Sequence, residues 1–308
     1  METTPLLDDQ ADSTSEQSIV EEGYEKRCGN ISRTGRTRGG LAGKIRSRIR
    51  ILSFYKEGCT FYDRTRILVA GLIAQIPKTL RDRFGIFNEM VCRAIDGVRV
   101  ERLGFIFYLT ALDDLIHTHP DFEREIRDWF DVGESGVFLD VGANIGRYSV
   151  SLAGRLDKVY AFEPSSRTFL ALVRNVDVNG LVNVHALKIA LWNGDGTESF
   201  YVKGRSGLGS LVRRDNSIRE ERITTRALDH LIDDLEIKRI DLVKIDVEGA
   251  EKEVLEGMRD TLLRFRPRLI VEVSKRNECW VNGFLGSLGY TQKGRRGMNQ
   301  LYLGDEGR

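Results

Sequence analysis

The stretch "VFLDVGANIGRYS" (Val137–Ser149) decides the fold of this chain. Its apolar start predicts a buried β-strand that ends at a carboxylate, Asp140, and leads through small residues into a helix. The glycines of the turn, Gly142 and Gly146, let the backbone approach a bound group, and the helix start offers free N–H groups. We therefore expect a ligand at this turn.

The pattern after residue 136 predicts an α/β fold. Apolar runs recur as "VFLDV", "KVYAFE", "VHALKIAL", "IDLVKIDV" and "RLIVEVS", and amphipathic stretches separate them. Strands that are apolar on both faces and linked by helices indicate a doubly wound, mostly parallel sheet with helices on both sides. In such sheets the ligand lies beyond the carboxyl ends of the strands. Polar residues at those ends are therefore candidate site residues.

The predicted strand ends are rich in carboxylates. The second strand stops at Glu163, the fourth stops at Asp246 and Glu248, and the fifth carries Glu272. Grouped carboxylates repel one another unless hydroxyls, backbone amides or a cation receive them. Glu163 can accept both hydroxyls of a ribose. Asp140 would repel a pyrophosphate but attract the ammonium and sulfonium groups of S-adenosylmethionine, so a cationic nucleoside ligand is favoured.

The glycine turn differs from the known phosphate-binding loops. The dinucleotide fingerprint GxGxxG requires a glycine where Asn144 stands, and no pyrophosphate-type lysine motif is present. Phosphate binding is therefore the weaker interpretation. A nicotinamide-dependent oxidoreductase remains the alternative enzyme class.

These motifs together carry a family resemblance. The sequence resembles the FkbM-type family of class I S-adenosylmethionine-dependent methyltransferases through "FLDVGANIGRYS", "YAFEPSSRTFLALVRNVDVNGL", "TTRALDHLI", "IDLVKIDVEGAEKEVLEGM", "RPRLIVEVS" and "LGY". The resemblance covers about residues 136–303 and implies a seven-stranded sheet whose last strand, "NQLYL", runs antiparallel. It also implies S-adenosylmethionine as the cofactor and, as the acceptor, a hydroxyl of a sugar, glycan precursor or related metabolite.

The resemblance further implies a set of cofactor-binding residues. They are the residues of the glycine turn, the acids at the strand ends and a contact to the adenine from the third strand: Asp140, Gly142, Ala143, Asn144, Gly146, Glu163, Ala190 and Asp246. Within this set the turn approaches the methionine part, and Glu163 receives the ribose diol. The adenine contact falls to the backbone and apolar surface of Ala190 and Leu191.

The segment "LVKIDVEGAE" carries the candidate catalytic residues. Methyl transfer to a hydroxyl needs alignment and a base, and Asp246 or Glu248, two residues apart on one side of a strand, can take the proton. In one alternative, Lys244, Glu248 and Glu251 form a structural ion-pair network and only Asp246 touches the ligand. In another, Asp246, Glu248 and Glu272 hold Mg²⁺. We expect no metal, because this trio lacks a defined ligand spacing.

Charge and periodicity divide the chain into three parts. The first 25 residues hold eight acids and no Lys or Arg, whereas Lys26–Arg50 holds nine basic residues and no acid, so residues 1–50 are predicted to be a disordered charged tail. Residues 51–132 form a mainly helical extension with a possible hairpin, and residues 133–308 the methyltransferase domain. Weak contact of the basic half with anionic surfaces, and a non-catalytic protein that docks through it, stay open.

Other features bear on location and on the acceptor. Four scattered cysteines without a CxxC pair predict reduced thiols and a cytoplasmic protein, and the early apolar run "ILVAGLIAQI" is too short to span a bilayer. Residues 203–215 are either a lid or a plain loop. Residues 102–114 are either a wall of the acceptor pocket or a hairpin packed on the sheet. His117 and His119 have a spacing that would suit a metal, but a solvated turn is favoured.

Overall fold

The computed structural model describes residues 54–76, 86–133, 135–203, 209–210 and 217–305. All of them belong to one compact unit, which spans residues 39–308. The predicted charged tail, residues 1–50, lies outside the described residues.

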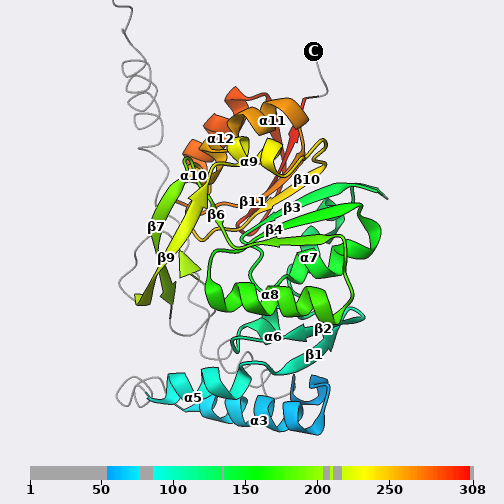
Figure 1. Cartoon of the computed structure of the whole chain (residues 1–308), viewed down its shortest axis with the longest axis vertical. Helices are drawn as coiled ribbons and strands as arrows, with labels where there is room; N and C mark the ends of the chain where they lie inside the picture. Colours follow the sequence, from blue (N-terminus) through cyan, green and yellow to red (C-terminus); the bar gives the residue numbers. More distant parts are fainter. Residues whose placement is uncertain (1–53, 77–85, 134, 204–208, 211–216, 306–308) are drawn as a thin grey trace, which may run out of the picture. The chain divides into compact units, whose positions relative to one another are not determined.

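A seven-stranded sheet forms the centre of the fold, in the order β5-β4-β3-β10-β11-β13-β12 (Figure 1). Its strands are β3 (Val137–Val141), β4 (Lys158–Phe162), β5 (Val184–Leu187), β10 (Leu242–Ile245), β11 (Arg268–Glu272), β12 (Tyr290–Arg296) and β13 (Asn299–Gly304). β13 runs antiparallel to both of its neighbours, and the remaining pairs in the sheet are parallel. The predicted doubly wound, mostly parallel sheet with an antiparallel last strand is confirmed.

Helices cover both faces of the sheet. One face packs against α7 (Arg147–Leu152) and α8 (Ser166–Val178), and the other against α9 (Leu228–Asp234), α10 (Glu251–Glu256), α11 (Arg259–Phe265) and α12 (Glu278–Ser287) (Figure 1). Successive strand residues serve opposite faces, so Phe138 belongs to the first apolar cluster and Leu139 to the second. Both are fully buried. This two-sided burial explains why the strands read as continuous apolar runs.

The N-terminal extension is helical with one hairpin. Its elements are η1 (Phe54–Glu57), α3 (Phe61–Gln75), α5 (Ile86–Ile95), β1 (Arg99–Arg102), β2 (Phe105–Tyr108), α6 (Asp114–His117) and η2 (Arg124–Phe130). α3 starts with a capping box, because Thr60 and Asp63 each accept a hydrogen bond from the other's backbone N–H. Asp63 also accepts from the backbone of Arg99, at 3.2 Å, which ties the helix to the hairpin.

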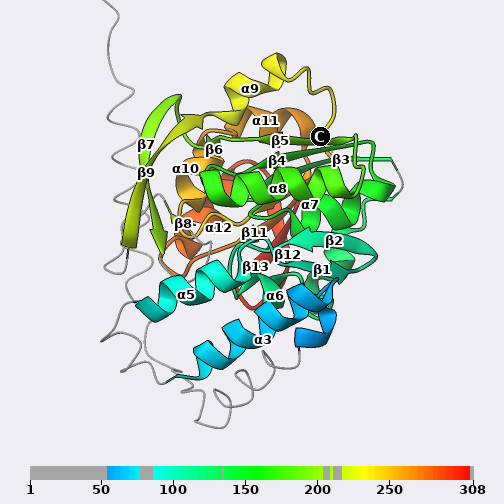
Figure 2. The same cartoon turned by 60° about the horizontal axis from the view of Figure 1, so that its bottom comes forward.

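The hairpin β1–β2 lies beside α8 (Figure 2). The backbone N–H groups of Ile106 and Tyr108 donate to the side-chain oxygens of Asn179 and Asn175, at 2.9 and 2.6 Å. Two amides on one helix face therefore pair with the free edge of a strand. Residues 102–114 thus contain part of the hairpin of the second interpretation, but its strand edge pairs with α8.

The predicted third strand is split between two sheets. β5 ends at Leu187, and Ala190–Leu191 form β6, which pairs with β9 (Ser217–Arg226) in a second sheet of order β6-β9-β7-β8. The expectation of one strand over residues 184–191 is wrong because its second half finds its hydrogen-bond partner about 35 residues later. The other strands of this sheet are β7 (Gly196–Lys203) and β8 (Gly209–Ser210). Most of the predicted lid, residues 204–208 and 211–215, lies outside the described residues.

Among the described residues, Cys59 and Cys92 are free thiols. Within the described part of the chain, no helix has the length and apolar character needed to cross a membrane.

The glycine turn between β3 and α7 owes its two glycines to packing. Gly142 has a φ of +84°, and a Cβ added there would lie 1.9 Å from the backbone oxygen of Asp246. Gly146 has a φ of +88°, and its Cβ would lie 2.6 Å from Leu172 of α8. Gly142 thus allows the turn to touch the end of β10, and Gly146 allows α7 to pack on α8.

We expect Gly142→Ala to lower the free energy of unfolding by about 2 kcal/mol or more, because the side chain adds backbone strain to a steric clash. Gly154→Ala is the matched control, since a Cβ there meets nothing within 4 Å and the backbone is not left-handed. Chemical denaturation of both variants measures the effect. Equal stability of the two variants would contradict the role given to Gly142.

Candidate active site

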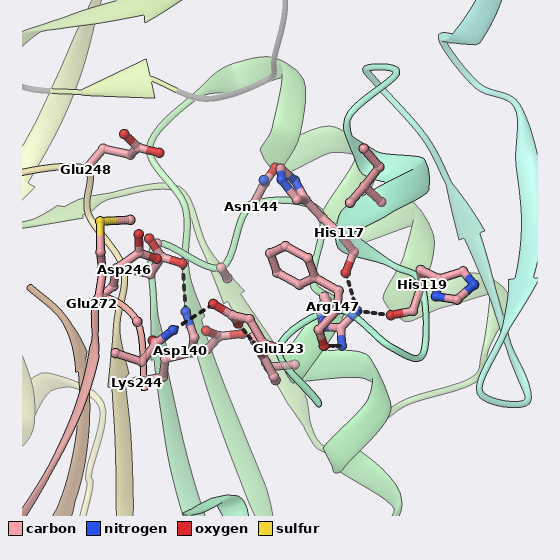
Figure 3. A pocket seen from close by; sticks show the side chains of 18 of the residues that line it. His117, His119, Glu123, Asp140, Asn144, Arg147, Lys244, Asp246, Glu248 and Glu272 are labelled. Carbon is pink, nitrogen blue, oxygen red and sulfur yellow. Dashed lines mark hydrogen bonds and ion pairs between the residues drawn. The ribbon is translucent and has the colours of Figure 1, made fainter. Parts of the chain in front are cut away.

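A cavity of about 590 Å³ opens at the carboxyl ends of the central strands (Figure 3). It brings together most of the predicted site residues, namely Asp140, Gly142, Ala143, Asn144, Glu163, Asp246 and Glu248. Gly146 does not line this cavity. A Cβ added at Gly146 would point toward Leu172. The turn therefore approaches the cavity through Gly142 to Asn144.

An apolar slot adjoins this cavity. Its lining is formed by Val141, Gly142, Phe162, Pro164, Ile189, Ala190, Leu191, Phe200, Val247 and Ala250. Gly142 and Phe200 line both spaces, so the slot and the cavity are neighbours. Ala190 thus lies at an apolar surface beside the glycine turn, although it belongs to the second sheet.

Glu163 follows β4 directly and is buried. One carboxylate oxygen accepts from the Ser165 backbone at 3.0 Å and from the Thr168 hydroxyl at 2.6 Å, and the other accepts from the Asn144 backbone at 2.9 Å. Burial raises the pKa of Glu163 to about 7, although these hydrogen bonds favour the charged form. Asn144, at a φ of +53°, also has a buried side-chain oxygen without a hydrogen-bond partner in the described structure.

Asp140 lies within β3 and not at its end. It is 2% exposed and accepts from the backbone N–H and the hydroxyl of Ser149, at 3.1 and 2.6 Å. Burial raises the pKa of Asp140, and the ammonium group of Lys244 opposes that rise. The carboxyl is therefore fixed by α7 at the floor of the cavity.

Lys244 is a central residue of the cavity. The sequence placed it only in a possible ion-pair network. Its side chain is 2% exposed, and its ammonium lies 2.7 Å from a carboxylate oxygen of Asp246 and 5.0 Å from the Tyr148 ring centroid (Figure 3). Burial would lower the pKa of Lys244, but Asp246 and Glu123 outweigh burial and raise it. Lys244 is therefore a permanent buried cation.

The carboxyls of Asp246 and Glu272 form a pair at the ends of β10 and β11 (Figure 3). Burial favours the neutral form of Asp246, yet Lys244 outweighs it and holds the pKa of Asp246 below its usual value. Burial, together with the charge of Asp246, raises the pKa of Glu272 to about 8. At neutral pH Glu272 thus carries a proton and hydrogen bonds to ionised Asp246.

The predicted ion-pair network takes a different form. Lys244 pairs with Asp246, whereas Glu251 accepts hydrogen bonds from Ser274 and Asn277. Glu248 has a φ of +54°, so it lies in a turn and the two-residue period of a strand does not relate it to Asp246. It nevertheless lines the cavity.

A magnesium site finds no support in the arrangement of the acids. Among the residues that the structure describes, no group of three or more His, Cys, Asp or Glu side chains is arranged to hold a metal ion. Asp246, Glu248 and Glu272 line one cavity without forming such a group.

The N-terminal extension forms part of the cavity wall. Its lining residues are Phe54, Ile116, His117, His119, Asp121, Phe122, Glu123 and Glu125. Arg147, the first residue of α7, donates to the backbone oxygens of His117, His119 and Phe122 and so holds this segment beside the turn (Figure 3). His117 ends α6 and His119 lies in the turn that follows, and the half-buried side chains of both line the cavity.

Glu123 and the turn between β12 and β13 complete the wall. Glu123 has a φ of +49° and accepts from the Tyr148 hydroxyl and, at 2.8 Å, from the Asn299 side chain. Asn299 and the three residues before it line the cavity. No local sequence motif marked these residues, because the contacts join segments far apart in the chain.

The raised pKa of Glu272 predicts a pH-dependent stability. Between about pH 5 and pH 8 the folded protein keeps a proton on Glu272 that the unfolded chain loses, so the free energy of unfolding should fall as pH rises. Glu272→Gln mimics the protonated group. We expect it to match the wild type near pH 5 and to be more stable near pH 8.

Thermal unfolding across this pH range tests the expectation. Glu198→Gln, at an exposed carboxylate of β7, serves as the control and should show a constant offset from the wild type. A constant offset for Glu272→Gln as well would mean that Glu272 titrates as an ordinary carboxyl.

The part of the chain that holds the glycine turn, Glu163 and Asp246 matches a known protein family. Residues 140–288 match the family described as the methyltransferase FkbM domain. This part of the chain is a methyltransferase FkbM domain. This match confirms the FkbM family resemblance found in the sequence.

The names of two curated relatives of this FkbM domain describe what each protein methylates. Over 130 residues the chain is 35% identical to the hexuronic acid methyltransferase AglP of Haloferax volcanii, covering 42% of this chain and 52% of that protein. It is 26% identical over 149 residues to the 2-O-methyltransferase NoeI of Sinorhizobium fredii, covering 42% and 60%. The chain spans less than two thirds of the length of these relatives.

The methyltransferase FkbM from Methylobacillus flagellatus is a similar solved structure. It aligns with a TM-score of 0.43 and 16% sequence identity, over 85% of this chain and 60% of that one.

Proposed function

We propose that this chain is an S-adenosylmethionine-dependent methyltransferase that acts on a hydroxyl of a sugar, glycan precursor or related metabolite. The observation that carries the proposal is the cavity at the strand ends of the FkbM domain, with buried carboxylates on one side and an apolar slot on the other. Such a site suits a ligand with a flat apolar end and a cationic end.

The residues present fit the cofactor. The slot beside Ala190 and Phe200 would take the adenine, and Glu163, at the end of β4, would accept from the ribose hydroxyls. The unpartnered oxygen of Asn144 and the buried carboxyl of Asp140 would favour the ammonium group. When bound, S-adenosylmethionine supplies a methyl group that its sulfonium already activates.

The same geometry argues against a nicotinamide cofactor. Asn144 replaces a glycine of the dinucleotide fingerprint, and its backbone N–H already donates to Glu163 at 2.9 Å. A pyrophosphate would need free N–H donors at this turn. The turn instead presents a carboxylate and a backbone N–H that already donates to Glu163.

For the proton transfer we propose Asp246 as the base. Lys244 keeps Asp246 ionised at neutral pH, and protonated Glu272 donates to it. An ionised carboxylate of low pKa is a weak base, so Asp246 would accept the hydroxyl proton while the methyl group leaves the sulfur and bonds to the hydroxyl oxygen. Glu248, which lines the same cavity from the following turn, is the second candidate.

Cofactor binding can be tested without an acceptor. S-adenosylhomocysteine should raise the melting temperature and NADH should not, because only a ligand of the folded state stabilises it. Glu163→Ala should weaken S-adenosylhomocysteine binding by about 1.5 to 3 kcal/mol through the loss of charge-assisted hydrogen bonds. Asp195→Ala is the control, since Asp195 accepts a backbone N–H from Ala227 outside the cavity. Stabilisation by NADH alone would overturn the cofactor assignment.

The catalytic role of Asp246 needs an acceptor, found by screening hydroxylated sugars with labelled S-adenosylmethionine. Asp246→Asn should lower kcat by about a hundredfold and leave S-adenosylhomocysteine affinity nearly unchanged. A parallel loss of affinity would instead assign Asp246 to electrostatic support of the sulfonium.

The same assay separates two further alternatives. Activity that EDTA removes and magnesium restores would make the acids metal ligands. Methylation of amines but not hydroxyls would overturn the choice of acceptor.

A further inference from the structure

Two side chains from outside the FkbM domain meet in the cavity wall. Glu123 belongs to the N-terminal extension and Asn299 begins β13, and neither lies within residues 140–288. Both line the cavity that also holds Asp246. They are therefore placed to contact the acceptor, which shares the cavity with the cofactor under the proposed function.

The hydrogen bonds of this pair fix the orientation of the Asn299 amide. Asn299 donates through its side-chain nitrogen to one oxygen of Glu123 at 2.8 Å, and the Tyr148 hydroxyl donates to the other. Because a carboxylate only accepts hydrogen bonds, the nitrogen of Asn299 must face Glu123 and its oxygen must face away.

The remaining oxygen of Asn299 has no hydrogen-bond partner within the described structure. Asn299 is only 5% exposed, so water reaches this oxygen poorly. A buried unpaired acceptor is unfavourable, and a ligand that donates an O–H or N–H group to it would relieve that cost. The wall at Asn299 and Glu123 thus requires a hydrogen-bond donor.

The charges that line the cavity oppose an anionic ligand. Eight of the lining residues are Asp or Glu, of which Glu272 is protonated at neutral pH, against three Lys or Arg. Each of the three cations is engaged: Arg147 with three backbone oxygens, Lys244 with Asp246, and Arg296 with Asp128. No lysine or arginine among the described lining residues is left to pair with a carboxylate or phosphate of an acceptor.

We infer that the acceptor is a polyol without negative charge, a neutral or amine-bearing sugar whose O–H or N–H groups donate to Asn299 and Glu123. Uronic acids and sugar phosphates are discriminated against, because they bring acceptor oxygens and negative charge to a wall of acceptors. The inference rests on the proposed function and narrows its substrate class.

Binding to the protein saturated with S-adenosylhomocysteine tests the inference without turnover. The probes are the methyl glycosides of glucose, galactose and mannose, each compared with its uronic acid counterpart by calorimetry at neutral pH and low salt. We expect at least one neutral sugar to bind about tenfold or more tightly than its uronate, with a ratio that shrinks as salt rises. Equal or tighter uronate binding, or no binding of any neutral sugar, would overturn the inference.

Two variants assign the discrimination to the wall. Asn299→Ala should weaken neutral-sugar binding about tenfold and leave S-adenosylhomocysteine binding unchanged. Asn282→Ala is the matched control, because this amide accepts the Tyr302 hydroxyl at 2.8 Å and does not line the cavity. Glu123→Gln, which keeps the size but removes the charge, should reduce the preference for neutral over uronate sugars. An unchanged preference in Glu123→Gln would overturn the assignment.

The outcomes separate this inference from the proposed function. Neutral sugars that bind in the expected order but accept no methyl group would keep the inference and refute methyl transfer to sugars. Efficient methylation of a uronate, with weaker binding of its neutral counterpart, would refute the inference and keep methyl transfer to sugars.

Discussion

The buried ammonium of Lys244 constrains the whole cavity. A charge that is 98% removed from solvent is costly unless carboxylates surround it, and Lys244 sits in the middle of the central strand β10. Asp246 must then stay ionised, which in turn leaves Glu272 as the protonated member of its pair. Glu123 contributes to the same charge balance from the extension. The protonation states of Asp246 and Glu272 are thus tied to one lysine.

Arg147 links the extension to the glycine turn in a comparable way. It follows Gly146 directly and satisfies three backbone oxygens of residues 117–122, so the segment that carries Glu123 is held by the first residue of α7. The cation also lies 5.2 Å from the ring centroids of Phe122 and Tyr148. The extension is therefore an integral part of the cavity.

The sequence allowed prediction of the sheet and of most acids at its edge, because two-sided burial and strand ends leave local signals. The division of the third strand after Leu187 leaves no local signal in the sequence. The residues on both sides of it are similarly apolar, and the strand that pairs with Ala190 is distant in the chain. The sequence placed Lys244 on the same strand face as Asp246, but the side chains of Glu123 and Tyr148, which also raise the pKa of Lys244, come from other segments. The contact between Glu123 and Asn299 joins residues 176 positions apart, beyond the reach of any local pattern.

The cavity wall at Glu123 and Asn299 lies outside the FkbM domain in the sequence, so changes of acceptor and changes of cofactor binding fall in different segments. Under the proposed function, the residues that hold the cofactor lie inside the FkbM domain, whereas Glu123 and Asn299 lie before and after it. Substitutions in these two flanking segments can then alter which molecule is modified while the glycine turn and strands β3, β4 and β10 stay unchanged. A change of acceptor, by evolution or by exchange of two short segments, then leaves the parallel strands of the sheet in place.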